Sequence, residues 1–291
     1  MRITRYLRSI NWRTLKKTID STLERRLLGL ASEIAFNTML SLFPAMLVIL
    51  TAIGLFENSL QNTFKDLAME MSQIVPQEVL SVIGGFVTRE IAQPKNSSLF
   101  SLSFAVAIWT ASGAISTAMR AFDEIHQIPR KKQRPFWKAK LISIGLTIGT
   151  VILLIIASFL VFISDLILRL IIGNNSYLSF LISIWQLVRW ALALSIVSTA
   201  FAVAYRYGPS TWQKGTPIFP GAATAAILWA LVSALFRVYV ERFGTYNKVY
   251  GAVGAVIVLM LWLWLSAAIF LVGDQLNVII GNRDKGVGSR E

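Results

Sequence analysis

Cysteine is absent from this chain of 291 residues, and histidine occurs once, at position 126. The lack of cysteine excludes disulfides, thiolate metal sites and cysteine nucleophiles. A single histidine also excludes a histidine-rich metal cluster contributed by one chain. Charged residues are scarce as well, at 15% of the sequence against roughly 25% in soluble domains. We therefore expect neither a metal centre nor a cofactor.

Long apolar runs fill much of the chain instead. Hydrophobic residues make up 55% of it, and six segments are long enough to cross a bilayer core, which takes about 20 helical residues. The expected spans are residues 29–56, 98–121, 139–170, 177–205, 217–239 and 249–280. The sequence thus predicts an all-α integral membrane protein, a bundle of six transmembrane helices at 29–280. A leader at 1–28 precedes the bundle, and a tail at 281–291 follows it.

The placement of basic residues predicts the orientation of this bundle. About 20 of the 28 Lys and Arg residues lie in the leader, in the tail, or near the joins of spans two to three and four to five. Cytoplasmic connections are enriched in Lys and Arg, so both termini are expected in the cytoplasm. The net charge of +13, including the run Arg130–Arg134, is explained by topology, and no nucleic-acid partner is expected.

Two segments outside the spans have amphipathic patterns. In the leader, Trp12, Leu15, Ile19 and Leu23 recur at helical spacing between charged residues, which favours a helix along the cytoplasmic headgroup surface. Residues 57–97, on the outer side, combine an apolar helical stripe with acidic residues. Two amphipathic helices that lie on the outer leaflet, or that cap the bundle, fit this spacing.

Arg189 is the most conspicuous polar residue within a span. It lies about twelve residues, or about 18 Å, into span four. An arginine this deep is expected to face the bundle interior or water, because a charge at the bilayer centre costs at least ~2.5–3.5 kcal/mol. It is either a structural arginine or a cation that binds an anionic group.

Further polar residues are predicted to share one depth near the cytoplasmic face. Glu33 and Asn37 lie one turn apart in span one, ahead of a kink expected at Pro44. Arg120 and Asp123 end span two, and Asp274 and Asn277 lie near the end of span six. Charge neutrality favours an ion-paired cluster of Glu33, Arg120, Asp123 and Asp274. Such a cluster is either structural or a gate for a proton or substrate.

Four motifs resemble the YihY/BrkB family of bacterial inner-membrane proteins. They occupy residues 36–44, 108–114, 246–255 and 273–277 and include the positions Trp109, Gly113, Tyr246, Asn247, Tyr250 and Gly251. The resemblance covers nearly the whole chain and implies the bacterial inner membrane as its location. This sequence has Asp274 where the family more often has glutamate, so any partner of this carboxylate must lie closer.

The resemblance implies two contrasting activities. Family members were once labelled as the tRNA-processing ribonuclease BN, and others look connected to the export of envelope lipids. A metal-dependent nuclease needs clustered acidic or histidine ligands, and a metal-free one usually needs histidine acid-base pairs. One histidine, with no carboxylate cluster in a cytoplasmic loop, speaks against the nuclease, and the lack of a nucleophile-base pair speaks against an enzyme.

Three functions remain as hypotheses. The leading one is a transporter or translocator of an anionic amphiphile, a lipid or lipid-linked envelope component, with Arg189 as the binding cation and helix movement about Pro44. The second is a scaffold of envelope machinery that binds other proteins, or a second copy of this chain, through residues 57–96 or 130–134. The third is an intramembrane lipid enzyme that uses Glu33, Asp123 or Asp274 as general acid-base. Membrane lipids are expected partners in every case.

Overall fold

The computed structural model describes residues 11–55, 97–172, 179–212, 215–242 and 244–288. Within these ranges, several side chains are not described, among them those of Arg189 and of residues 241–252. The described residues form seven α-helices, one short 3₁₀ helix and no strands. The predicted all-α class is therefore confirmed, and six of the helices are long and apolar enough to cross a membrane.

The helices extend a few residues beyond most of the predicted spans. α2 (Trp12–Glu24) precedes the first long helix, and η1 (Arg130–Lys132) follows the second. The six long helices are α3 (Leu27–Leu55), α6 (Ser97–Ile125), α7 (Phe136–Ile172), α8 (Ser179–Tyr207), α9 (Phe219–Arg242) and α10 (Gly244–Gly288). Pro44 lies inside α3, which continues past it to Leu55.

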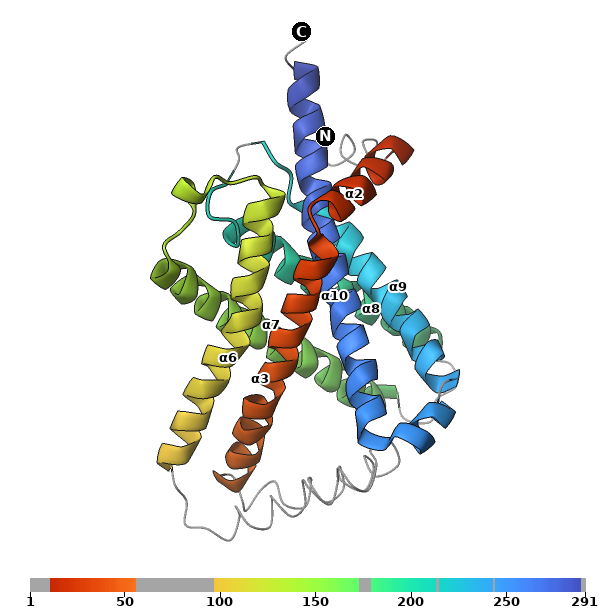
Figure 1. Ribbon diagram of the computed structural model, residues 1–291. Coiled ribbons are helices and arrows are strands. Elements are labelled where there is room, and N and C mark those ends of the chain that lie inside the picture. The colour runs from red at the N-terminus through yellow and green to blue at the C-terminus, as the bar shows by residue number, and fades with distance from the viewer. Residues whose placement is uncertain (1–10, 56–96, 173–178, 213–214, 243, 289–291) are drawn as a thin grey trace.

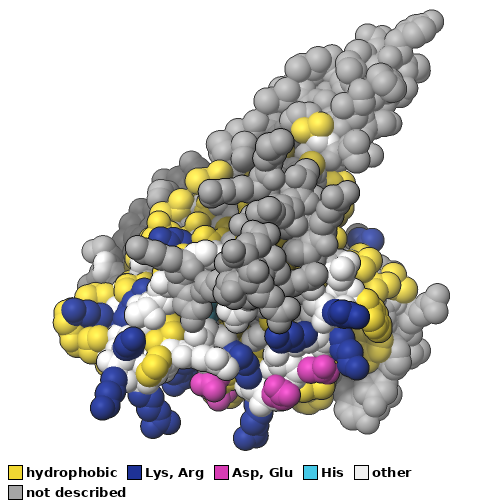
Figure 2. Space-filling model, turned by 90° about the horizontal axis from the view of Figure 1, so that it is seen from above, with side chains coloured by type: hydrophobic (Ala, Val, Ile, Leu, Met, Phe, Trp, Pro, Cys, Tyr) yellow, Lys and Arg dark blue, Asp and Glu magenta, His cyan; other side chains and the backbone are white. Residues whose placement is uncertain are grey.

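The bundle is organised around α3 and α10, which lie side by side (Figure 1). α6 packs on α3, α9 packs on α10, and α7 runs obliquely behind α3 and α6. One end carries α2, η1, residues 208–212 and 215–218, and the C-terminal end of α10. We call it the basic end, because Lys and Arg side chains line much of its surface and acidic ones are fewer (Figure 2).

The best-packed core lies close to the basic end. Phe122 of α6, Tyr205 of α8 and Leu271 of α10 are almost fully buried in it, and α3 and α9 contribute Ala31 and Ala222. Phe122 meets the rings of Tyr205 and Phe270 edge to face, at centroid distances of 5.7 and 5.3 Å. Five helices thus share one core, which fixes their spacing at this end.

Glycine permits the close crossing of α9 and α10. A Cβ atom on Gly221 would collide with the carbonyl oxygen of Gly273 and with the side chain of Asn277. A Cβ atom on Gly273 would collide with the Tyr205 hydroxyl and with Ala225. Small residues let transmembrane backbones approach in this way.

α2 turns its threonines inward and its apolar side chains outward. Thr14, Thr18 and Thr22 are buried, and α2 packs on α10. Trp12 and Leu23 are exposed, as are Leu15 and Ile19 between them. This leaves an apolar stripe among exposed charged residues, an amphipathic pattern expected of a helix at a membrane surface. That location remains a prediction.

Candidate functional site

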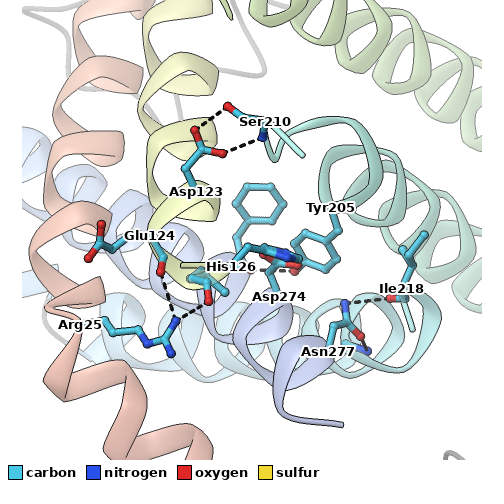
Figure 3. A network of polar contacts seen from close by, with 12 residues as sticks. Arg25, Asp123, Glu124, His126, Tyr205, Ser210, Ile218, Asp274 and Asn277 are labelled. Atoms are coloured by element: carbon cyan, nitrogen blue, oxygen red, sulfur yellow. Dashed lines mark hydrogen bonds and ion pairs between the residues drawn. The ribbon is translucent and has the colours of Figure 1, made fainter. Parts of the chain in front are cut away.

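The polar residues of the basic end separate into three sites rather than one. Asp274 lies next to His126, Asp123 binds Ser210, and Glu33 pairs with Arg120 (Figure 3 shows the first two). The expected single cluster of Glu33, Arg120, Asp123 and Asp274 does not form: Glu33 and Arg120 pair with each other, but Asp123 and Asp274 bind other residues. The four residues were grouped by depth, but depth along a helix does not decide which partner each side chain meets.

The first site is a buried carboxylate–imidazole pair. Asp274 Oδ2 and His126 Nε2 lie 3.1 Å apart, and the two side chains are 1% and 0% exposed. His126 follows the last residue of α6, and the ring of Trp212 lies 5.9 Å from its imidazole ring. A buried charge needs such a partner, because removing either member leaves the other uncompensated.

Unsatisfied polar atoms accompany this pair on α10. Among the described residues, neither the second carboxylate oxygen of Asp274 nor the amide nitrogen and oxygen of Gln275 has a hydrogen-bond partner. Both residues are almost completely buried. Buried polar groups of this kind are uncommon in proteins, so each calls for a physical reason.

Asn277, one turn beyond, joins α10 to the beginning of α9. Its Oδ1 accepts a hydrogen bond from the Gly221 amide at 2.7 Å, and its Nδ2 donates to the Ile218 carbonyl at 3.0 Å. The first amides of a helix have no partner within the helix, so Asn277 supplies one from a neighbouring helix. These two bonds give Asn277 a structural role.

The second site fixes the loops of the basic end. Asp123 accepts hydrogen bonds from the Ser210 amide at 2.6 Å and from its hydroxyl at 2.7 Å. Arg134 donates to the carbonyls of Tyr207 and Gly208, and its own amide donates to the Ser210 hydroxyl. Burial lowers the pKa of the Arg134 guanidinium from its ordinary value, and the Asp123 carboxylate opposes that shift. Arginine nevertheless stays charged, so these contacts hold two loops against α6.

The third site, formed by Arg120 and Glu33, is exposed rather than buried. Arg120 lies 3.5 Å from Glu33, with the two side chains 69% and 56% exposed. Thr117 accepts hydrogen bonds from Arg120 at 3.0 Å and from Asn37 at 3.1 Å. Asn37 Oδ1 would also lie in ordinary contact with a Cβ atom on Gly113. Two of the four family motifs, around Asn37 and Gly113, therefore meet at the contact of α3 and α6.

Trp109, the other motif position on α6, meets a lysine from α7. Lys140 Nζ lies 4.2 Å from the centroid of the Trp109 ring and donates to the Trp109 carbonyl and the Ser112 hydroxyl. These bonds and the cation–π contact satisfy an amine near the start of a candidate span.

Several predicted residues lie outside the described side chains. Arg189 belongs to α8, and Tyr246, Asn247, Tyr250 and Gly251 belong to α10, but only their backbone is described. The outer segment 57–97 lies outside the described residues except for its last residue. The predictions for these positions stay predictions.

Sequence reasoning missed most of the partners. His126 was used only to exclude a metal cluster, although the one histidine of the chain lies three residues after Asp123 at the end of a span. Ser210, Thr117 and Arg134 have no distinctive spacing in the sequence. Within the described ranges, no group of three or more His, Cys, Asp or Glu residues is arranged to hold a metal ion.

Comparison with known proteins identifies relatives along most of the chain. It is 28% identical to the ribonuclease-like protein YfkH of Bacillus subtilis (strain 168) over 255 residues, which cover 88% of this chain and 90% of that protein. It is 27% identical to a UPF0761 membrane protein of Verminephrobacter eiseniae over 288 residues, which cover 96% of this chain but 65% of that protein. A UPF0761 membrane protein of Vibrio vulnificus is 23% identical, with 87% of this chain and 78% of the relative covered.

The chain thus spans nearly all of YfkH but slightly less than two thirds of the Verminephrobacter relative. No solved structure matches the chain. The family model described as virulence factor BrkB matches residues 18–290. The resemblance seen in the four motifs is confirmed, and the chain is a membrane protein that belongs to the BrkB family.

Proposed function

We propose that this protein is a transporter that moves an anionic amphiphile, a lipid or lipid-linked envelope component, across the bacterial inner membrane without catalysing a reaction. The observation that carries the proposal is the exposed guanidinium of Arg120. It belongs to the apolar helix α6 and contacts Glu33 of α3 and Thr117 of α6. A cation exposed at this position is a binding group for an anionic headgroup.

The depth of Arg120 suits a lipid headgroup. It lies five residues, or about 7.5 Å, from the end of the candidate span Ser101–Ile125. On this proposal, Arg120 lies in the zone between the headgroups and the acyl chains. Phe36 and Leu40 follow Glu33 along one face of α3 and are exposed. They supply an apolar surface on which the chain of the same amphiphile can lie.

The energy of the ion pair favours exchange. An exposed salt bridge contributes about 0–1 kcal/mol, so a headgroup that replaces Glu33 loses little. Arginine binds phosphate and carboxylate through two parallel hydrogen bonds, each stronger than a neutral one. Both described contacts of Arg120 use Nη2, so donors of the guanidinium remain for a headgroup.

Deeper in the membrane, the proposal uses Arg189 of α8 as a second cation. An arginine near the middle of a span supports the movement of an anion past the apolar core of the bilayer. Pro44 within α3 has no backbone N–H, so one hydrogen bond of the helix is absent there and the helix can bend at that point. The orientation with both termini in the cytoplasm, supported by the charges of the basic end, is part of this proposal.

The test is lipid movement in vesicles. Purified protein is reconstituted into liposomes with a trace of fluorescent NBD-labelled phosphatidylglycerol, and dithionite then bleaches the outer leaflet. We expect wild type to expose the inner-leaflet probe faster than protein-free vesicles do, and faster than it exposes NBD-labelled phosphatidylcholine. Arg120→Ala should slow this about tenfold or more, since a hydrogen bond to a charged group contributes about 1.5–3 kcal/mol.

Two controls accompany this assay. Arg120→Lys keeps the charge and should retain part of the rate, and Arg130→Ala removes an exposed arginine of η1 outside the spans. Wild-type vesicles that behave like protein-free ones would refute the transport proposal. Equal rates of lipid movement for Arg120→Ala and Arg130→Ala would show that Arg120 takes no specific part in transport.

A further inference from the structure

The buried pair of Asp274 and His126 takes no part in headgroup binding at Arg120. We propose that this pair is a proton-binding site that exchanges with water at the basic end and couples lipid movement to a proton gradient. The coupling rests on the transport function proposed above, whereas the proton site stands on the geometry alone.

The charge of the pair changes by one unit when a proton leaves. With one shared proton between Nε2 and Oδ2, the pair is neutral overall, as imidazolium and carboxylate or as imidazole and carboxylic acid. Without that proton it carries one negative charge in a site that is at most 1% exposed. An uncompensated buried charge costs several kcal/mol, so loading and unloading must alter the packing around α10.

The surroundings of the pair include groups that a hydrated proton would need. Asp274 Oδ1 and the Gln275 amide are buried without a partner among the described residues. A buried water is held by two to four polar groups of this kind. A purely structural ion pair would explain the 3.1 Å contact but not these neighbouring atoms.

The charged and titratable neighbours come from several elements. Arg25, the residue after α2, donates to the carbonyls of Glu124 and Ile125 beside His126, and Tyr205 of α8 lies next to Asp274 (Figure 3). Arg206 lies 4.7 Å from the centroid of the Trp212 ring, and that ring lies 5.9 Å from the ring of His126. Asp123 and Arg134 bind the adjacent loop at Ser210, and α9 contributes the apolar Gly221 and Ala225 on this side of α10. On this proposal, the proton reaches water past Trp212 and the exposed Arg206.

The proposed step transfers a proton and no electrons. A hydronium ion at the basic end gives its proton to the His126–Asp274 pair and leaves a water molecule. The same proton is later released to water when the pair becomes accessible from the other side. One proton moved with each lipid would change the equilibrium distribution of that lipid about tenfold for each pH unit of gradient.

The single histidine makes the first test specific, because ¹⁵N-labelled histidine reports His126 alone. In lipid nanodiscs, we expect its ring nitrogen resonances to respond reversibly to pH while the protein stays folded. The pH dependence should change in Asp274→Asn and be retained in Asp274→Glu. Ring resonances that do not respond to pH in folded wild type would overturn the proposal, and this result needs no variant.

The second test uses the dithionite assay with a pH difference across the membrane. We expect the leaflet distribution of the NBD-labelled phosphatidylglycerol to follow the sign of the gradient in wild type and to ignore it in Asp274→Asn. A responsive histidine with a lipid distribution indifferent to the gradient would overturn the coupling. Absence of lipid movement at every pH, with a responsive histidine, would refute the transport function and leave the proton site supported.

Discussion

The two ends of the bundle use similar residues in opposite ways. At the basic end, Phe122 is 1% exposed and packs against two other aromatic rings. Nearer the opposite end, Phe43 of α3 is 60% exposed. Polar side chains at the basic end bind partners from other helices, while exposed apolar side chains dominate the described surface of α3 beyond Asn37. Among the described residues, the basic end is therefore the more tightly packed part, and the exposed apolar side chains of α3 are suited to contact with lipid.

Replacing one phenylalanine at each end gives the largest contrast. Phe122→Ala should destabilise the protein by about 3–5 kcal/mol, because it leaves a cavity in the shared core. Phe43→Ala should change stability by about 0.5 kcal/mol or less, as for other surface positions. Unfolding in mixed detergent micelles, followed by tryptophan fluorescence, measures both. Equal losses for the two variants would contradict the contrast.

The loss of the two hydrogen bonds by which Asn277 joins α10 to α9 comes next in size. Asn277→Ala leaves the Gly221 amide and the Ile218 carbonyl without their partner, at about 1–3 kcal/mol for each buried group. Asn282→Ala, five residues further along α10 at an exposed position, is the matched control. In the same unfolding measurement, Asn277→Ala should be clearly less stable than Asn282→Ala. A reversed ranking would show that the two Asn277 bonds do not stabilise the contact of α9 and α10.

Loss of the contact between Asp123 and Ser210 should destabilise the protein less and more locally. Asp123→Ala removes two hydrogen bonds to Ser210, at about 1.5–3 kcal/mol for bonds to a charged group. We expect faster proteolysis within residues 208–218 and little change elsewhere. Glu124→Ala, whose side chain is exposed, should be cleaved like wild type. Similar cleavage of both variants would mean that Asp123 does not hold the loop.

The exposed ion pair should have the smallest effect on stability. Glu33→Gln is expected to change the free energy of unfolding by about 0–1 kcal/mol, since the pair with Arg120 is exposed. It should nevertheless raise the affinity for an anionic lipid, because it removes the carboxylate that competes for Arg120. Lipid titration with fluorescence detection separates the two readouts. A large stability loss with unchanged affinity would make this pair a structural one.

The sequence predicted the helices well because hydrophobic length is a local property. The expected span 98–121 corresponds to α6 at Ser97–Ile125, and 217–239 corresponds to α9 at Phe219–Arg242. The boundaries differ by a few residues where polar residues such as Asp123 continue a helix beyond its apolar part.

The candidate site was less predictable because depth along a helix does not give the direction of a side chain. Asp274 and Arg120 were rightly placed near one end. The direction in which each side chain points from its helix axis, which depth does not give, brings Asp274 to His126 and Arg120 to Glu33. His126 lies just beyond the apolar run, where hydropathy gives no signal. Its partner Asp274 comes 148 residues later in the sequence, a separation that no local pattern spans.

The central claim is that an anionic headgroup binds Arg120 within the spans. Mass spectrometry of the lipids that co-purify with the detergent-extracted protein tests it most directly, with wild type, Arg120→Ala, Arg189→Ala and the control Arg130→Ala compared at equal yield. The account predicts an anionic lipid enriched on wild type and on Arg130→Ala, and reduced on Arg120→Ala and Arg189→Ala. The same lipid profile on all four proteins, or no selective lipid on any, would contradict it.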